Sequence, residues 1–240
     1  PKLMGRIGIK VAPSRPNVVY VIVEAREGSL YRSDDRGETF RLVYKDPNIV
    51  NRGFYYTEIR VDPADENRVY AMSLGLFVSI DGGKTFRRIA RSAHGDFHTL
   101  WIDPKDPSRL WVGDDGGLFV SHDRGETWEY VNTIPLGQFY QVAYDFREPF
   151  YYVCGGLQDN GTWCGPSRTR HFSVIPNDFW YLVSYGDGFH VAIHPKNPDL
   201  YLTEFQGGGI LRTELSKARQ QDASPQPKRN DGGPVGELTY

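Results

Sequence analysis

The sequence predicts an all-β fold, a β-propeller of about five blades with four antiparallel strands each. Two phased repeats and the composition predict this fold. The 240 residues include 26 Gly and 16 Pro, and 14 % of them are aromatic. Glycine and proline favour tight turns, while aromatic residues favour strands. The composition therefore indicates many short strands joined by tight turns.

The first repeat is the eight-residue pattern Ser-x-Asp-x-Gly-x-Thr-aromatic. It occurs over residues 33–40, 79–86 and 121–128, and each copy follows a short apolar run. Asp, Ser and Thr oxygens make turn hydrogen bonds, Gly permits unusual backbone angles, and the aromatic ring can pack between blades. We therefore expect each copy to form the turn between the third and fourth strands of a blade.

These repeated residues have a structural rather than a catalytic interpretation, because identical residues in every blade serve a role that every blade needs. The residues assigned to the structural turns are Asp35, Gly37, Thr39, Asp81, Gly83, Thr85, Asp123, Gly125 and Thr127.

The second repeat is an apolar run that ends at a proline. Its copies end at Pro13, Pro63, Pro104 and Pro195, and Phe146 marks a degenerate copy. Another strand-like run follows each copy after a short turn. These five positions are 50, 41, 42 and 49 residues apart, a period that is typical of propeller blades.

These motifs carry a family resemblance. The sequence resembles the Asp-box (bacterial neuraminidase repeat) propellers, and among them the large bacterial sortilin-like and glycosyl-hydrolase-like proteins. Residues 94–98, 113–117 and 158–161 resemble hallmarks of that bacterial group. The resemblance covers about residues 5–214 and implies the propeller fold. It leaves function open, because Asp boxes also occur in sialidases, xyloglucanases, sorting receptors and assembly factors.

The predicted organisation is a run of Asp-box blades over residues 1–214, a polar linker over 215–235, and the start of a following segment at 236–240. A propeller closes only when its last blade meets its first, so an open arc of blades would expose apolar surface. We therefore expect the remaining blades of the same protein, or another chain, to complete the propeller.

Charge and hydropathy exclude two kinds of partner. The 28 basic residues nearly balance the 30 acidic ones, which argues against nucleic acid as a partner. The longest clean apolar run, Val18–Val23, is far shorter than the roughly 20 residues that cross a bilayer. No membrane span is therefore expected.

Turn alternation places the candidate site. In a four-stranded blade, the turns between second and third strands and the crossovers between blades share one end, opposite the Asp boxes. We call this end the rim. Position eight before each repeat end gives Asp96, Gln138 and Asp187, and position six gives His98 and Tyr140. Turns at the same end hold acidic residues and aromatic rings, so we expect a ligand there.

The rim residues allow several kinds of chemistry. A carbohydrate or a peptide could bind His98, Gln138, Tyr140, Gln158, Asn160 and His190. Glycoside hydrolysis needs two carboxylates at a set separation, and the candidates are Asp96, Asp114, Asp115, Asp159 and Asp187. The same acidic segments are also ordinary tight turns.

A divalent metal is the one cofactor for which the sequence offers ligands. His94, Asp96 and His98 would lie on one side of an extended strand, where side chains alternate with period two. The alternative for this segment is a polar hydrogen-bonded cluster that supports the rim. No other cofactor is expected.

Cys154 and Cys164 enclose nine residues with Asn-Gly near the tip, which suits a hairpin with a cross-strand disulfide. A disulfide indicates an exported protein, which would be secreted, periplasmic or on the cell surface. The sequence thus favours an exported binding or scaffolding propeller that recognises a carbohydrate, peptide or protein on its rim. The alternative is a xyloglucanase-like glycoside hydrolase that uses the rim carboxylates.

Overall fold

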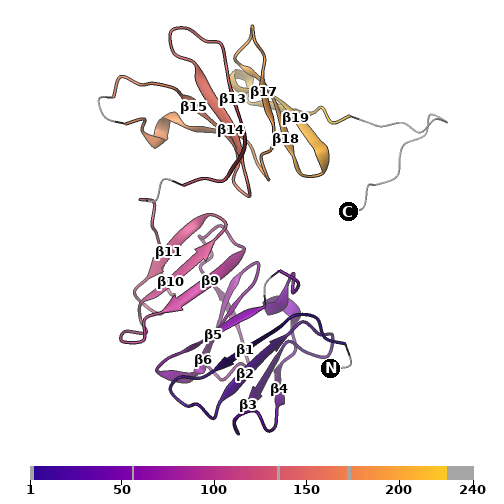
Figure 1. Ribbon diagram of the computed structural model, residues 1–240, viewed down its shortest axis with the longest axis vertical. Coiled ribbons are helices and arrows are strands. Elements are labelled where there is room, and N and C mark those ends of the chain that lie inside the picture. Colours follow the sequence, from indigo (N-terminus) through magenta and orange to yellow (C-terminus); the bar gives the residue numbers. More distant parts are fainter. Residues whose placement is uncertain (1–2, 56, 134–135, 172–173, 226–240) are drawn as a thin grey trace, which may run out of the picture. The chain divides into compact units, whose positions relative to one another are not determined.

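The computed structural model describes residues 3–55, 57–133, 136–171 and 174–225 (Figure 1). These residues form five four-stranded antiparallel sheets, each with its strands hydrogen-bonded in chain order. The predicted all-β fold of four-stranded propeller blades is thus confirmed. The chain divides into two compact units, with sheets 1–3 in residues 1–135 (unit 1) and sheets 4 and 5 in residues 136–240 (unit 2).

The strands of unit 1 are short. Sheet 1 contains β1 (Ile7–Val11), β2 (Val19–Val23), β3 (Leu30–Ser33) and β4 (Arg41–Tyr44). Sheet 2 follows the 3-10 helix η1 (Pro47–Val50) and contains β5 (Glu58–Asp62), β6 (Asp65–Met72), β7 (Leu76–Ser79) and β8 (Arg87–Ile89). Sheet 3 contains β9 (Phe97–Ile102), β10 (Leu110–Asp114), β11 (Gly117–Ser121) and β12 (Glu129–Tyr130).

Unit 2 contains sheets 4 and 5. Sheet 4 contains β13 (Phe139–Tyr144), β14 (Tyr152–Leu157), β15 (Gly161–Pro166) and β16 (Tyr181–Ser184). The 3-10 helix η2 (Asn177–Phe179) lies between β15 and β16 in the chain. Sheet 5 contains β17 (Val191–Ile193), β18 (Leu200–Phe205), β19 (Gly209–Glu214) and β20 (Arg219–Asp222). The 3-10 helices η3 (Gln206–Gly208) and η4 (Leu215–Lys217) connect its last three strands. Among the described residues, no helix has the length and apolar character needed to cross a membrane.

Strand β20 lies inside the segment expected to be a linker. It pairs with β19 from Leu211–Asp222 to Glu214–Arg219, so sheet 5 runs to Asp222 rather than ending at residue 214. All four β20 side chains are polar and exposed. A strand with no apolar face has no alternation to reveal it, and only its backbone pairing defines it. The expected following segment, 236–240, lies outside the described residues.

The core of unit 1 lies between adjacent sheets. Strand β6 shows why, because successive side chains of a strand point to opposite faces. Val69 and Ala71 pack in the cluster shared with sheet 1, while Tyr70 and Met72 pack in the cluster shared with sheet 3. Sheet 2 therefore contributes one apolar face to sheet 1 and the other to sheet 3.

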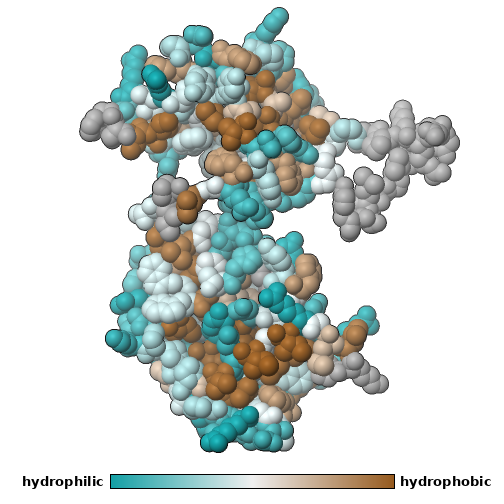
Figure 2. Space-filling view, in the orientation of Figure 1, coloured by the Kyte–Doolittle hydropathy of each residue, from teal (hydrophilic) through white to brown (hydrophobic). Residues whose placement is uncertain are grey.

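Sheet 1 keeps one apolar face exposed. Ile7, Ile9 and Val11 of β1 are about half exposed, and Figure 2 shows hydrophobic residues over β1 and β2. In the repeat alignment these positions match Thr57, Ile59 and Val61 of sheet 2, all of which are buried. The same strand positions are thus covered in sheet 2 and uncovered in sheet 1.

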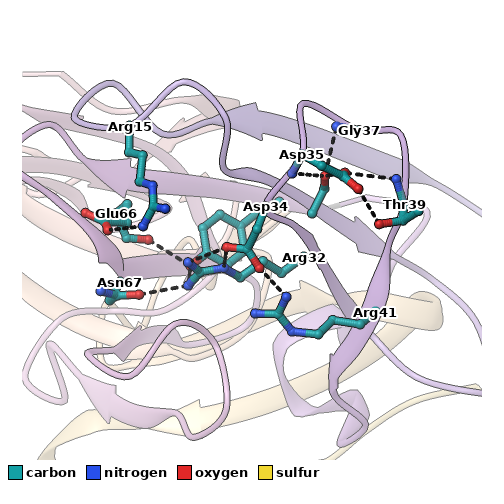
Figure 3. A network of polar contacts seen from close by, with 11 residues as sticks. Arg15, Arg32, Asp34, Asp35, Gly37, Thr39, Arg41, Glu66 and Asn67 are labelled. Carbon is teal, nitrogen blue, oxygen red and sulfur yellow. Dashed lines mark hydrogen bonds and ion pairs between the residues drawn. The ribbon is translucent and has the colours of Figure 1, made fainter.

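Polar contacts also join sheets 1 and 2 (Figure 3). The buried Arg32 guanidinium donates to the Tyr20 hydroxyl and to Asn67 Oδ1, both at 2.8 Å. Asp34 pairs with Arg32 and Arg41. The Tyr20 hydroxyl donates in turn to the Glu66 carbonyl at 2.8 Å. A buried guanidinium needs such partners, because an unpaired buried charge is strongly destabilising.

The predicted Asp boxes make the same hydrogen bonds in all three copies, at the turns that join β3 to β4, β7 to β8 and β11 to β12. In the first box, Asp35 accepts from the Thr39 amide and hydroxyl at 2.9 and 2.5 Å (Figure 3). Ser33 Oγ accepts from the Gly37 amide at 2.8 Å. The equivalent bonds are made around Asp81 and Asp123.

The box glycines have left-handed backbone angles, which a residue with a Cβ atom rarely adopts. Gly83 and Gly125 also approach the preceding sheet, since an added Cβ would lie 2.6 Å from Leu30 Cδ2 and 2.9 Å from Ile89 Cδ1 respectively. Around Gly37 the nearest atom belongs to Phe40, at 3.7 Å. Two boxes therefore support contacts between sheets as well as their own turns.

The core of unit 2 contains the predicted disulfide. Cys154 and Cys164 are directly paired residues of β14 and β15, and both are fully buried. They pack with Val183, Val191 and Tyr201 between sheets 4 and 5. The disulfide prediction is confirmed. It crosses the hairpin below the tip, so it restrains the 158–160 turn from its base.

Candidate functional site

The rim of unit 1 gathers one set of the predicted residues. The crossover from β4 to β5 carries Arg52 and Tyr55, the crossover from β8 to β9 carries Asp96, and the turn after β10 carries Asp115. Arg52 Nη1 lies 3.3 Å from Asp96 Oδ2. His98 Nε2 lies 2.9 Å from Asp115 Oδ1, and the His98 and Tyr55 rings meet edge to face with centroids 5.2 Å apart.

Asp114 joins two segments of this rim through backbone hydrogen bonds. Its carboxylate accepts the amides of Gly116 and Gly117 at 2.9 and 3.0 Å and that of Gly95 at 3.3 Å. Burial raises the pKa of Asp114, although these three amides act in the opposite direction. The carboxylate therefore holds its own turn and also joins it to the crossover that carries Asp96.

The three residues expected to bind a metal do not form a ligand set. Among the described residues, no group of three His, Cys, Asp or Glu side chains is placed to hold a metal ion. The expectation assumed an extended strand through His94, Asp96 and His98. Strand β9 begins only at Phe97, and both Gly95 and Asp96 have positive φ angles, so period-two alternation does not hold there.

The rim of unit 2 gathers the other predicted residues. Asp187 Oδ1 accepts the Asp159 amide at 2.6 Å, and Asp187 Oδ2 accepts from Gln206 Nε2 at 3.0 Å. The Tyr140 ring lies 4.8 Å from that of Phe189. Burial, together with the charges of Asp187 and Asp159, raises the pKa of Tyr140.

The hairpin turn between β14 and β15 holds Gln158 and Asn160, and the two other predicted residues of this rim make backbone hydrogen bonds. Asn160 Nδ2 donates to the Gln158 carbonyl at 3.0 Å, and the Asn160 carbonyl accepts from Trp163 Nε1 at 2.7 Å. The Gln158 backbone amide donates to the Gln138 carbonyl at 3.0 Å. His190 takes part through its backbone, because its carbonyl accepts from the Glu204 amide.

Three members of these clusters were not among the predicted site residues. Arg52 and Gln206 each bind a predicted aspartate, and Arg6 Nη1 donates to the Tyr55 carbonyl at 2.8 Å. All three lie in or beside rim turns. Only their location in or beside a rim turn indicated a role in the site, because none of the three occupies a position that the repeats share.

The aspartates of the two clusters make contacts within turns and crossovers. Asp96, Asp114 and Asp187 each accept from a side chain or an amide that fixes a turn. In contrast, Phe54 is 75 % exposed and Tyr55 is 50 % exposed on the same crossover. The arrangement presents aromatic rings to solvent on a polar scaffold.

One protein-family model matches a short part of this chain. The family described as BNR-Asp box repeat matches residues 118–131, which include the third predicted box. The chain thus contains a BNR-Asp box repeat. No curated protein matches the sequence.

Solved propeller structures align with most of this chain. The GH74 enzyme of Niastella koreensis is 12 % identical, with 92 % of this chain and 38 % of that chain covered and a TM-score of 0.44. The GH74 xyloglucanase from Xanthomonas campestris is 18 % identical, with coverages of 95 % and 38 % and a TM-score of 0.38. YCF48 bound to D1 peptide is 12 % identical, with coverages of 90 % and 66 % and a TM-score of 0.38.

This chain therefore spans 38 % of the length of each of these two GH74 enzymes.

Proposed function

We propose that this chain is the binding part of an exported β-propeller protein, which recognises a carbohydrate, peptide or protein at its rim. The observation that carries the proposal is the exposed pair Phe54 and Tyr55 in unit 1. Arg6 anchors the loop that holds them, since it donates to both of their carbonyls. Exposed rings on a fixed loop bind sugars or peptides at a low cost in conformational entropy.

The surrounding polar groups support recognition rather than simple adhesion. The Arg52–Asp96 pair and the contact of His98 with Asp115 provide donors and acceptors beside the rings. Binding sites combine apolar contact area with a few such groups, which set orientation. The buried Cys154–Cys164 disulfide supports an oxidising location outside the cytoplasm.

Glycan-array and peptide-array binding of the full chain tests the proposal. Phe54→Ala should weaken binding about five- to tenfold, because central aromatic residues each contribute more than ~1 kcal/mol. Phe40→Ala is the matched control, since Phe40 is an exposed phenylalanine of the same unit at the Asp-box end. Equal binding by both variants, or no binding by the wild type, would reject the rim of unit 1 as the site.

A second candidate function is glycoside hydrolysis. It needs two carboxylates, and Asp96 and Asp114 belong to the same rim, where burial raises the pKa of Asp114, the direction that a general acid requires. Polysaccharide hydrolysis by the wild type, lost in Asp114→Asn and in Asp96→Asn, would support an enzyme. If the wild type and both variants bind the polysaccharide and none of them hydrolyses it, the result would support the binding function alone.

We also propose that the exposed face of β1 binds another four-stranded sheet, supplied by further blades of the same protein or by another chain. The burial of the matching residues of sheet 2 under sheet 1 supports this. The isolated chain should therefore self-associate or bind such a partner in light scattering. A monodisperse, closed monomer would contradict the proposal.

A further inference from the structure

The turn between β13 and β14 contains a cavity that the rim does not use. Its volume is about 440 Å³, and it is lined by Tyr144, Asp145, Phe146, Arg147, Glu148 and Tyr151. The lining residues lie within one stretch of eight. The turn is at the opposite end of β14 from residues 158–160, at a distance of roughly 17 Å along the strand.

Three aromatic side chains form its walls. Tyr144, Phe146 and Tyr151 are 61 %, 66 % and 47 % exposed. The Tyr144 ring lies 5.5 Å from the Phe146 ring and 5.9 Å from the Tyr151 ring, with interplanar angles of 65° and 66°. Rings that meet at such steep angles form corners rather than one flat platform.

The charges in the cavity leave it acidic. Asp145 is buried and pairs with the Arg147 side chain, and it also accepts the Tyr152 amide at 2.8 Å. These two opposite charges balance, so the exposed Glu148 gives the cavity its net negative charge.

The same turn already holds one cation against a ring. The Arg147 guanidinium carbon lies 3.8 Å from the centroid of Tyr152. Ring faces carry negative electrostatic potential, and they attract cations within about 6 Å of the centroid. Aromatic corners with a nearby carboxylate are the arrangement that recognises ammonium groups.

We propose that this open cavity binds an alkylammonium cation, in contact with Tyr144, Phe146 and Tyr151 and paired with Glu148. The ammonium can come from a quaternary amine or from a lysine side chain, since both present the same charge on an alkyl chain. The site is independent of the rim ligand, because it shares no residue with either rim cluster.

Calorimetric titration of the full chain tests this site with choline, with Nα-acetyl-lysine methylamide, and with neohexyl alcohol, the uncharged carbon analogue of choline. We expect choline or the lysine derivative to bind and the alcohol to bind at least several-fold more weakly. Methyl glucoside should not compete. Preference for choline would assign the site to quaternary amines, and preference for the lysine derivative would assign it to lysine side chains.

Variants locate the binding. Tyr144→Leu and Glu148→Gln should each weaken cation binding roughly two- to fivefold, the range expected for loss of one exposed cation–π or ionic contact. Tyr185→Leu is the matched control, because Tyr185 is an exposed tyrosine elsewhere in unit 2. All three replace exposed side chains, and circular dichroism checks their folding. Equal affinity for choline and the alcohol, preference for methyl glucoside, or an unchanged affinity in Glu148→Gln would overturn the proposal.

Discussion

Sheets 1 and 2 have the same strands and the same Asp box, but they differ on one face. Ile9 of β1 is 60 % exposed, whereas the matching residue of β5, Ile59, is fully buried. The boxes nonetheless make the same threonine hydrogen bonds to Asp35 and Asp81. The comparison separates what a repeat forms by itself from what it forms only with a preceding sheet.

The box aromatic residues follow the same division. Phe86 packs against the core between sheets 1 and 2, and its ring lies 4.9 Å from that of Tyr44. Phe40, its counterpart in sheet 1, is 45 % exposed. The turn geometry is thus local, while burial of the ring and of the strand face depends on the neighbouring sheet.

The largest expected difference is between two isoleucine truncations. Ile59→Ala should destabilise unit 1 by about 2–5 kcal/mol, because it removes buried methyl groups and leaves a cavity. Ile9→Ala should change stability by no more than about 0.5 kcal/mol. Urea unfolding of both variants measures the two effects. Equal losses would show that the β1 face is covered in solution and would break the comparison.

A smaller difference is expected between two box glycines. Both Gly37 and Gly83 have positive φ, so alanine at either should cost about 1–2 kcal/mol in backbone strain. Gly83→Ala should cost about 1–3 kcal/mol more, because its Cβ would lie 2.6 Å from Leu30 Cδ2. Gly37→Ala is therefore the internal control for strain. Thermal unfolding that ranks the two variants equally would argue against box-mediated contact between sheets.

The sequence allowed the repeated features to be predicted because each one is local. The box bonds join residues at most four positions apart, so the spacing alone specifies them. Turn alternation likewise grouped Asp96, His98, Asp114 and Asp115 at one end of the strands. Blade number and strand order followed from the phase of the two repeats.

Other features depend on contacts that no local pattern encodes. In sheet 5, which lacks a box, Asp199 accepts the Ser216 amide and hydroxyl at 2.7 and 2.6 Å across 17 residues. This long-range bond fastens the turn before β20 in place of a box. The extended backbone expected through His94, Asp96 and His98 is absent for a related reason, because the left-handed backbone at Asp96 is a property of the folded crossover.

The smallest expected effect is the pH dependence of the boxes, and it tests whether they act alone. Hydrogen bonds from Ser33 and Thr39 lower the pKa of Asp35 to about 2. Burial opposes the shift at Asp81, but hydrogen bonds from Thr85 and Ser79 still lower its pKa. Both folded pKa values lie below the unfolded value of about 3.9, so the stabilisation is complete above about pH 4 and is lost as the pH falls toward 2.

Asp35→Asn should therefore lower the melting temperature at neutral pH, and the gap to the wild type should narrow as the pH falls from about 4 toward 2. The effect should be modest, since solvent screens exposed carboxylates. Asp81→Asn should behave alike, because the same hydrogen bonds hold both boxes. A gap that stays constant with pH would contradict the assigned role of the carboxylate. A pH dependence seen only in Asp81→Asn would show that the box turn also needs a preceding sheet. The hydrogen bonds within the box would then belong to the features that depend on a neighbouring sheet.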